Sequence, residues 1–143
     1  MKKLNERKVP AMAFFHMPPA EFKEAYEKMK LGDHSVIYEH GSIGEKNEYF
    51  GISNRPPHFF EKAVDNGWLK WIFCGHDHLN TLSLTYKGIR MTYGMSIDYL
   101  GYSGIAKQYI QRGATLITRK TNGNIDITMV PLTTVVSTRV RGA

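Results

Sequence analysis

Hydrophobic and polar positions divide the first part of the chain into a strand and a helix. The run Val-Pro-Ala-Met-Ala-Phe-Phe over 9–15 predicts an apolar strand that ends at His16. A pair of prolines then interrupts the pattern, and a helix is predicted over 20–30, since proline is tolerated where a helix begins. Its apolar face recurs at helical spacing and consists of Phe22, Tyr26 and Met29.

The next segment predicts a long loop, a second helix and a second core strand. Residues 31–55 are polar and punctuated by glycines, which indicates a loop longer than compact domains usually contain. A helix is predicted over 56–66, and Gly67 suits its C-terminal cap. A strand is predicted over 68–74. The expected buried face of this helix is Phe59, Phe60, Ala63 and Val64.

Turn signals in the second half predict antiparallel hairpins. Lys87-Gly88 separates two alternating segments, and Thr-Asn-Gly-Asn over 121–124 separates two more. The predicted strands are 81–86, 89–93, 114–119 and 125–130, with a Gly- and Tyr-rich loop over 95–110 and an edge strand or disordered tail over 135–143. This order predicts an α/β layered fold with a mixed sheet, organised as a single domain over 1–143.

Composition narrows the classes of partner. The 143 residues carry a formal net charge of +6, which suits anionic substrates such as phosphate esters. No concentrated Lys/Arg run is present, so we expect no specific nucleic-acid binding. No apolar run is long enough to cross a membrane and no signal peptide is recognisable, which leaves the compartment open. Cys74 is the single cysteine, so no internal disulfide forms, and we expect a buried, inert thiol.

The candidate chemistry lies where the two core strands end. Trp71–Cys74 is apolar and leads into Gly75, after which His76 and His78 follow at a spacing that places both on one side of an extended chain. If the two core strands are neighbours, their carboxyl ends converge and His16 joins this pair in one cavity. Neutral imidazoles are good transition-metal ligands, and Asp77 and Asp98 are candidate acceptors that orient them.

Each histidine also has a simpler interpretation. A His-x-His pair is common by chance, and a histidine that follows a strand is more often a surface residue. His34, His40 and His58 lie in the polar loop or at a helix start, where the solvated interpretation is preferred.

Several motifs together resemble the C-terminal half of a calcineurin-like metallophosphoesterase of the purple-acid-phosphatase-like branch. Phe14-Phe15-His16-Met17-Pro18 is similar to the family's penultimate metal motif, and Gly75-His76-Asp77-His78 is similar to its terminal Gly-His-x-His motif. Further matches lie at Gly94, at 101–104 and at 112–114, so the resemblance spans about 9–131. It implies a partial β-sandwich flanked by helices.

The resemblance also implies roles for individual residues. His16 and His76 would be ligands of one metal ion and His78 a ligand of a second, with iron, zinc or manganese as the occupants. Two such ions clamp a phosphate ester and activate water for attack. Residues that would contact the phosphate or the leaving group are Tyr99, Tyr102 and Arg112.

The chain departs from the family in its earlier motifs. Asp-x-His, Gly-Asp-x-x-Asp and Gly-Asn-His-Asp/Glu have no counterpart at suitable positions, and Gly32-Asp33-His34 comes after the penultimate motif instead of before it. The chain is therefore expected to be a fragment, a truncated reading frame or half of a split protein. A missing N-terminal half or self-association would then cover its apolar face. Three hypotheses stay open: a phosphoesterase site completed from outside this chain, an inactive remnant that binds partners, and a mononuclear zinc protein with three histidine ligands.

Overall fold

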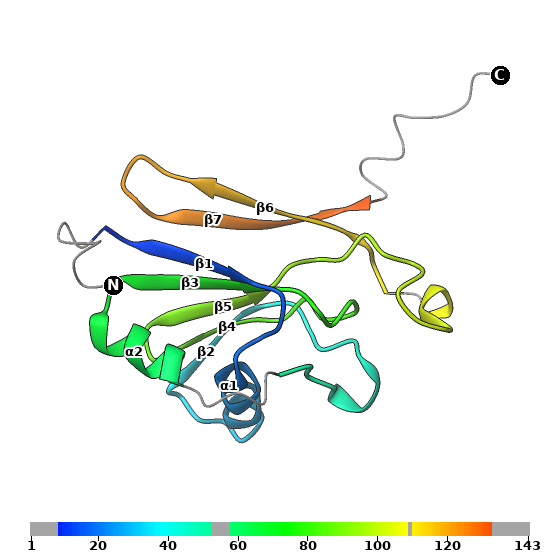
Figure 1. Cartoon of the computed structure of the whole chain (residues 1–143), viewed down its shortest axis with the longest axis horizontal. Helices are drawn as coiled ribbons and strands as arrows, with labels where there is room; N and C mark the ends of the chain where they lie inside the picture. The colour runs from blue at the N-terminus through cyan, green and yellow to red at the C-terminus, as the bar shows by residue number, and fades with distance from the viewer. Residues whose placement is uncertain (1–8, 53–57, 109, 133–143) are drawn as a thin grey trace. The chain divides into compact units, whose positions relative to one another are not determined.

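The computed structural model describes residues 9–52, 58–108 and 110–132. The chain, drawn in Figure 1, forms two compact units, Met1–Tyr93 and Gly94–Ala143. The prediction of a single domain over 1–143 stays a prediction.

The first unit is built on a five-stranded mixed sheet. Its strands, in spatial order, are β1 (Ala11–Phe15), β3 (Leu69–Cys74), β5 (Ile89–Tyr93), β4 (Ser83–Tyr86) and β2 (Val36–His40). The first three run parallel, and β4 is antiparallel to both of its neighbours. The predicted core strands are therefore adjacent, and their last residues, Phe15 and Cys74, are paired in register.

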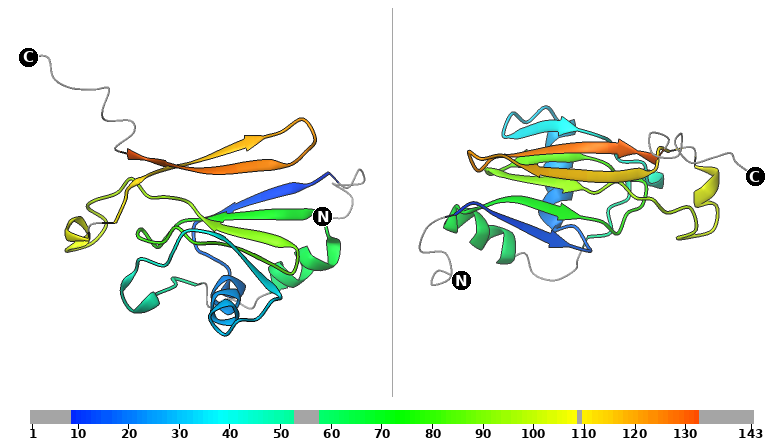
Figure 2. Two further views of the ribbon diagram at one scale, coloured as in Figure 1. Left: turned by 180° about the vertical axis from the view of Figure 1, so that it is seen from behind. Right: turned by 90° about the horizontal axis from the view of Figure 1, so that it is seen from above.

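Two helices pack against the sheet in this unit. The helix α1 (Ala20–Lys30) has the predicted bounds and contacts β2 and β4, whereas α2 (His58–Asn66) contacts β3 (Figure 2). Among the helices described, none is long and apolar enough to cross a membrane. The core between helices and sheet includes Phe22, Ala25, Phe60, Ala63, Ile72, Leu84, Met91 and Tyr93.

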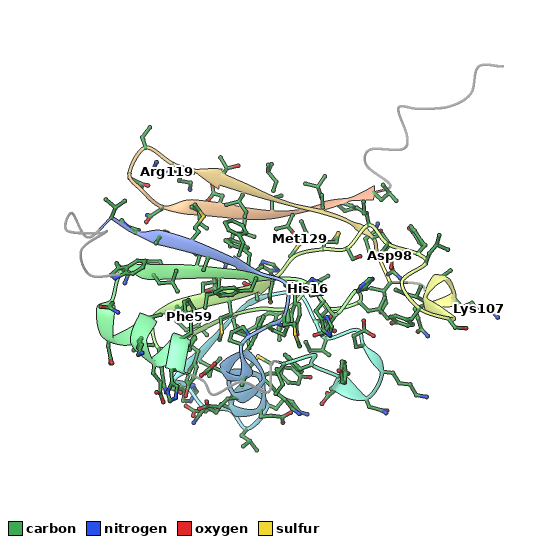
Figure 3. All side chains as sticks on the ribbon, viewed as in Figure 1. His16, Phe59, Asp98, Lys107, Arg119 and Met129 are labelled. Atoms are coloured by element: carbon green, nitrogen blue, oxygen red, sulfur yellow. The ribbon has the colours of Figure 1, made fainter. Side chains whose placement is uncertain are left out.

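Two predictions about this unit are corrected. Phe59 was expected to be buried, but 40% of it is exposed, and its ring packs edge-on against Phe15 (Figure 3). The loop predicted over 31–55 contains β2 and a short 3-10 turn over Lys46–Glu48. Val36 is buried, and β2 is held by antiparallel pairing with β4, a partner more than 40 residues away that local polarity does not reveal.

The hairpin that joins β4 to β5 has the predicted turn. Lys87 and Gly88 have φ values of 48° and 75°, and two consecutive left-handed residues match the twist of the flanking strands. Gly67, with φ of 71°, follows α2 and donates its N–H to the carbonyl of Ala63 at 3.1 Å, as expected of a C-terminal cap.

The described part of the second unit contains a loop followed by a two-stranded hairpin. The loop contains a short 3-10 turn over Ile105–Lys107, and β6 (Gly113–Arg119) pairs antiparallel with β7 (Ile125–Pro131). This hairpin confirms the predicted turn at 121–124. The predicted tail strand over 135–143 lies outside the described residues. The predicted α/β class, with a mixed sheet and C-terminal antiparallel strands, is confirmed.

Candidate functional site

The carboxyl ends of β1 and β3 bring two predicted site residues together. His16 follows β1 directly, and His76 follows β3 after one glycine. The backbone N–H of Gly75 donates to the carbonyl of His16 at 3.0 Å, which extends the parallel pairing one step past the strands. Figure 3 shows His16 where the strand ends, and the predicted convergence of the two strand ends is confirmed.

The two imidazoles are in direct contact. Nε2 of His16 lies 3.1 Å from Nδ1 of His76, and the rings stand nearly perpendicular, at 83°, with centroids 5.1 Å apart. In this arrangement one ring nitrogen carries a hydrogen and donates a hydrogen bond to the other, and the tautomer decides which of the two is the donor. Two nitrogen ligands about 2.0–2.1 Å from a tetrahedral ion stand roughly 3.3–3.4 Å apart. The observed N···N distance of 3.1 Å is close to this value, and the assignment of the pair as ligands of one metal ion stays a prediction.

The third predicted ligand, His78, is half-buried and does not complete a cluster. Within the ranges that the structure describes, no group of three or more His, Cys, Asp or Glu side chains is placed to hold a metal ion. The expectation of an extended chain at this point is wrong. His76 has φ of 69°, and the N–H of Asp77 bonds to the carbonyl of Gly75 at 2.9 Å, so the chain turns here. The three-histidine ligand set stays a prediction.

Asp77 lies between His76 and His78 in the sequence, and its carboxylate is buried. It accepts the backbone N–H of Gly51 at 3.0 and 3.1 Å and the hydroxyl of Tyr93 at 2.6 Å. Burial and the neighbouring carboxylate raise the pKa of Tyr93, so its hydroxyl keeps the proton that it donates. The other predicted acceptor, Asp98, belongs to the second unit and accepts the N–H groups of Leu100 and Gly101.

A loop over 41–52 is fixed beside His76 by a residue that sequence analysis missed. Asn80 is fully buried, and its Oδ1 accepts the N–H groups of Gly44 and Glu45 at 3.0 and 3.1 Å. Its Nδ2 donates to the carbonyl of Tyr49 at 3.1 Å. No periodic signal marks Asn80; its position just after the His-Asp-His run is the single local hint.

The predicted phosphate contacts lie in the second unit. Arg112 is 1% exposed, and its guanidinium donates to the carbonyls of Asp98, Ile110 and Ile105 at 2.6, 2.7 and 3.2 Å. It also lies over the ring of Tyr99, 5.1 Å from the centroid. These contacts hold the loop before β6. Tyr99 and Tyr102 are 43% and 44% exposed, and the role of all three in phosphate binding stays a prediction.

His40 differs from the solvated loop residue that was expected. It ends β2, and its Nε2 is buried without a hydrogen-bond partner. Burial lowers the pKa of His40, as does Arg90, while Glu39 partly opposes the change. His34 and His58 are exposed, as predicted.

Comparisons with known proteins point to one group of phosphatases. No family model matches the chain, and no solved structure matches it. It is similar to three proteins of Arabidopsis thaliana named probable inactive purple acid phosphatase 29, 28 and 14. The identities are 28%, 31% and 38% over 65%, 65% and 67% of this chain. The chain spans about a fifth of the length of these relatives, 21%, 20% and 21% respectively. These similarities support a relationship of this chain to the purple acid phosphatases.

Proposed function

We propose that this chain carries part of the site of a metal-dependent phosphoesterase. His16 and His76 hold one metal ion and His78 holds a second, with iron, zinc or manganese as the occupants. Bound metal supplies Lewis-acid polarisation of a phosphate ester and a water of lowered pKa. The contribution of this chain is to present the imidazole nitrogens at a fixed spacing.

One observation carries this proposal: the approach of His16 Nε2 to His76 Nδ1 within 3.1 Å at the ends of adjacent parallel strands. Ligands of α/β proteins bind outside such strand ends. The similarity to purple acid phosphatases adds support from an independent direction.

Carboxylate ligands from another polypeptide segment would complete the site. A charged di-metal centre needs such groups, and the carboxylate nearest His76, that of Asp77, already accepts the N–H of Gly51 and the hydroxyl of Tyr93. The strand β1 lies at the edge of its sheet, with Phe14 65% and Phe15 39% exposed. An apolar groove of about 390 Å³ runs between β1 and α2. Parallel strands are normally covered on both faces of their sheet. A further segment docked against β1 would supply this cover and bring the carboxylate ligands.

A second candidate is an inactive remnant that binds partners. The names of the three relatives mark them as inactive, and this favours a chain that has kept the fold without catalysis. The groove beside β1 would then be its binding surface. A mononuclear zinc site on His16, His76 and His78 is the third alternative.

Hydrolysis of p-nitrophenyl phosphate separates these candidates. The purified chain is loaded with zinc, iron or manganese and compared with the native protein from its source cells, whose intact mass is measured. We expect little or no hydrolysis by the chain alone. We expect hydrolysis by a heavier native protein, abolished by His76→Ala and unaffected by His34→Ala, which alters an exposed histidine away from the strand ends. A native protein that folds and never hydrolyses the ester would favour the inactive remnant.

A further inference from the structure

His76 occupies a strained position in the backbone. Its φ of 69° is left-handed, and the N–H of Asp77 donates across it to the carbonyl of Gly75 at 2.9 Å. A hydrogen bond between residues two apart, around a central residue of positive φ, is the rare form of the γ-turn. A left-handed residue other than glycine costs roughly 1–2 kcal/mol. Such strain persists where the surroundings enforce it.

The surroundings that enforce it converge on the ring of His76. Gly51 lies so close that a Cβ built on it would collide with Cδ2 of the His76 ring and press on Oδ1 of Asp77. The carboxylate of Asp77 holds Gly51 there through two contacts to its N–H, at 3.0 and 3.1 Å. Glycine is required here because of this close approach to the ring.

Tyr93, in the sheet, holds the carboxylate of Asp77 through a hydrogen bond. It ends β5, has no exposed surface, and donates its hydroxyl to Oδ2 of Asp77 at 2.6 Å. Asp77 is itself 5% exposed, and a buried carboxylate stays stable when hydrogen bonds satisfy its oxygens. The chain Tyr93–Asp77–Gly51 therefore joins the sheet core to the loop that covers one edge of the imidazole.

The contact with Gly51 covers one edge of the His76 ring and leaves the nitrogen on the other edge facing His16. Gly51 packs on the side of the ring that carries Cδ2 and Nε2, while Nδ1 faces Nε2 of His16 at 3.1 Å. We propose that Gly51, Asp77 and Tyr93 form a positioning clamp that holds the His76 ring with Nδ1 toward His16. The clamp rests on the proposed function where it treats this pair as metal ligands. It acts through His76 and touches no substrate.

Two substitutions test the clamp, each with a matched control. Tyr93→Phe removes one hydroxyl from Asp77, and its control is Tyr86→Phe, which removes a buried-ring hydroxyl bonded to Glu24 at 2.7 Å. Gly51→Ala adds a methyl group against His76, and its control is Gly32→Ala, where nothing lies within 4 Å. Gly32 has a φ of 77°, so this control costs stability through backbone strain but leaves the surroundings of His76 unchanged. If Gly51→Ala fails to fold, Tyr93→Phe decides the outcome.

The first readout is the ring ¹⁵N signals of His16 and His76 in metal-free, ¹⁵N-histidine-labelled protein. The second is a titration with Co²⁺, followed by its visible absorption. Both clamp variants should shift the His76 signals and weaken Co²⁺ binding about 10–100-fold, the usual effect of losing a group that orients a ligand. The controls should change neither readout.

Unchanged His76 signals in folded Tyr93→Phe and Gly51→Ala would overturn the clamp, whatever their loss of stability. A wild-type chain that binds no Co²⁺ would instead contradict the proposed metal site in this chain. The ring signals would still decide the clamp in that case, because they are recorded without metal.

Discussion

Asn80 offers a quantitative test of how the loop over 41–52 is held. Its side chain makes three hydrogen bonds to the backbone of that loop, to Gly44, Glu45 and Tyr49, at 3.0–3.1 Å. Each such bond contributes about 0.5–1.5 kcal/mol net. Asn80→Ala removes all three from a fully buried position, so the free energy of unfolding should fall by about 3 kcal/mol.

Urea denaturation followed by circular dichroism measures this change. For a small protein with an m value of about 1–3 kcal/mol/M, the midpoint should fall by roughly 1–3 M. Amide hydrogen exchange should also speed up across 41–52 more than in β3 and β5, because the loop loses its anchor while the strand pairing remains.

Two further variants control the Asn80 experiment. Asn122→Ala alters an exposed turn asparagine with one bond, to the N–H of Asn124 at 3.0 Å, and should change stability by less than about 1 kcal/mol. Asn80→Asp keeps an acceptor oxygen for Gly44 and Glu45, loses the donor to Tyr49 and introduces a buried charge. An Asn80→Ala protein within about 0.5 kcal/mol of wild type, with unchanged exchange in the loop, would refute the reasoning.

Three other predictions concern single side chains. In the folded protein the pKa of His40 is lowered below its ordinary 6.5. As the pH falls through 6.5, His40 is therefore protonated in the unfolded chain before it is protonated in the folded protein. The free energy of unfolding should therefore decrease toward acid. The urea midpoint should change more between about pH 7.5 and about pH 5.5 in wild type than in His40→Gln. An equal change in the two proteins would show that His40 is not the cause. Phe22→Ala truncates a fully buried ring packed on Tyr93 and should lower the free energy of unfolding by about 3–5 kcal/mol in the same assay; a loss below about 1 kcal/mol would contradict the core assignment. Cys74 is 4% exposed and burial raises its pKa, so a thiol reagent should label it at the rate of unfolding, and rapid labelling of the native protein would disprove its burial.

Local signals were enough for elements whose sequence and environment agree. The helix over 20–30 and the turn at Lys87-Gly88 were predicted because spacing and turn chemistry act within a few residues. The strand β2 was missed, since Ile37 and Tyr38 are 57% and 55% exposed and no alternation of buried and exposed positions marks it. Its pairing with β4 depends on contacts remote in sequence.

The candidate site also has one part that the sequence predicted and one part that it did not. The approach of His16 to His76 followed from one topological assumption, that the two core strands are neighbours. The turn at His76 was not predictable, because it depends on a contact between Asp77 and Gly51, 26 residues apart. The same contact redirects the chain before His78, so the spacing of the histidines in sequence did not establish their spacing in space.

A crystal structure of the zinc-soaked protein, with an anomalous difference map at the zinc edge, tests the central claim most directly. The account predicts a peak about 2.0–2.1 Å from both Nε2 of His16 and Nδ1 of His76. It would be contradicted by a zinc-saturated crystal without that peak, in which the two imidazoles remain hydrogen-bonded to each other.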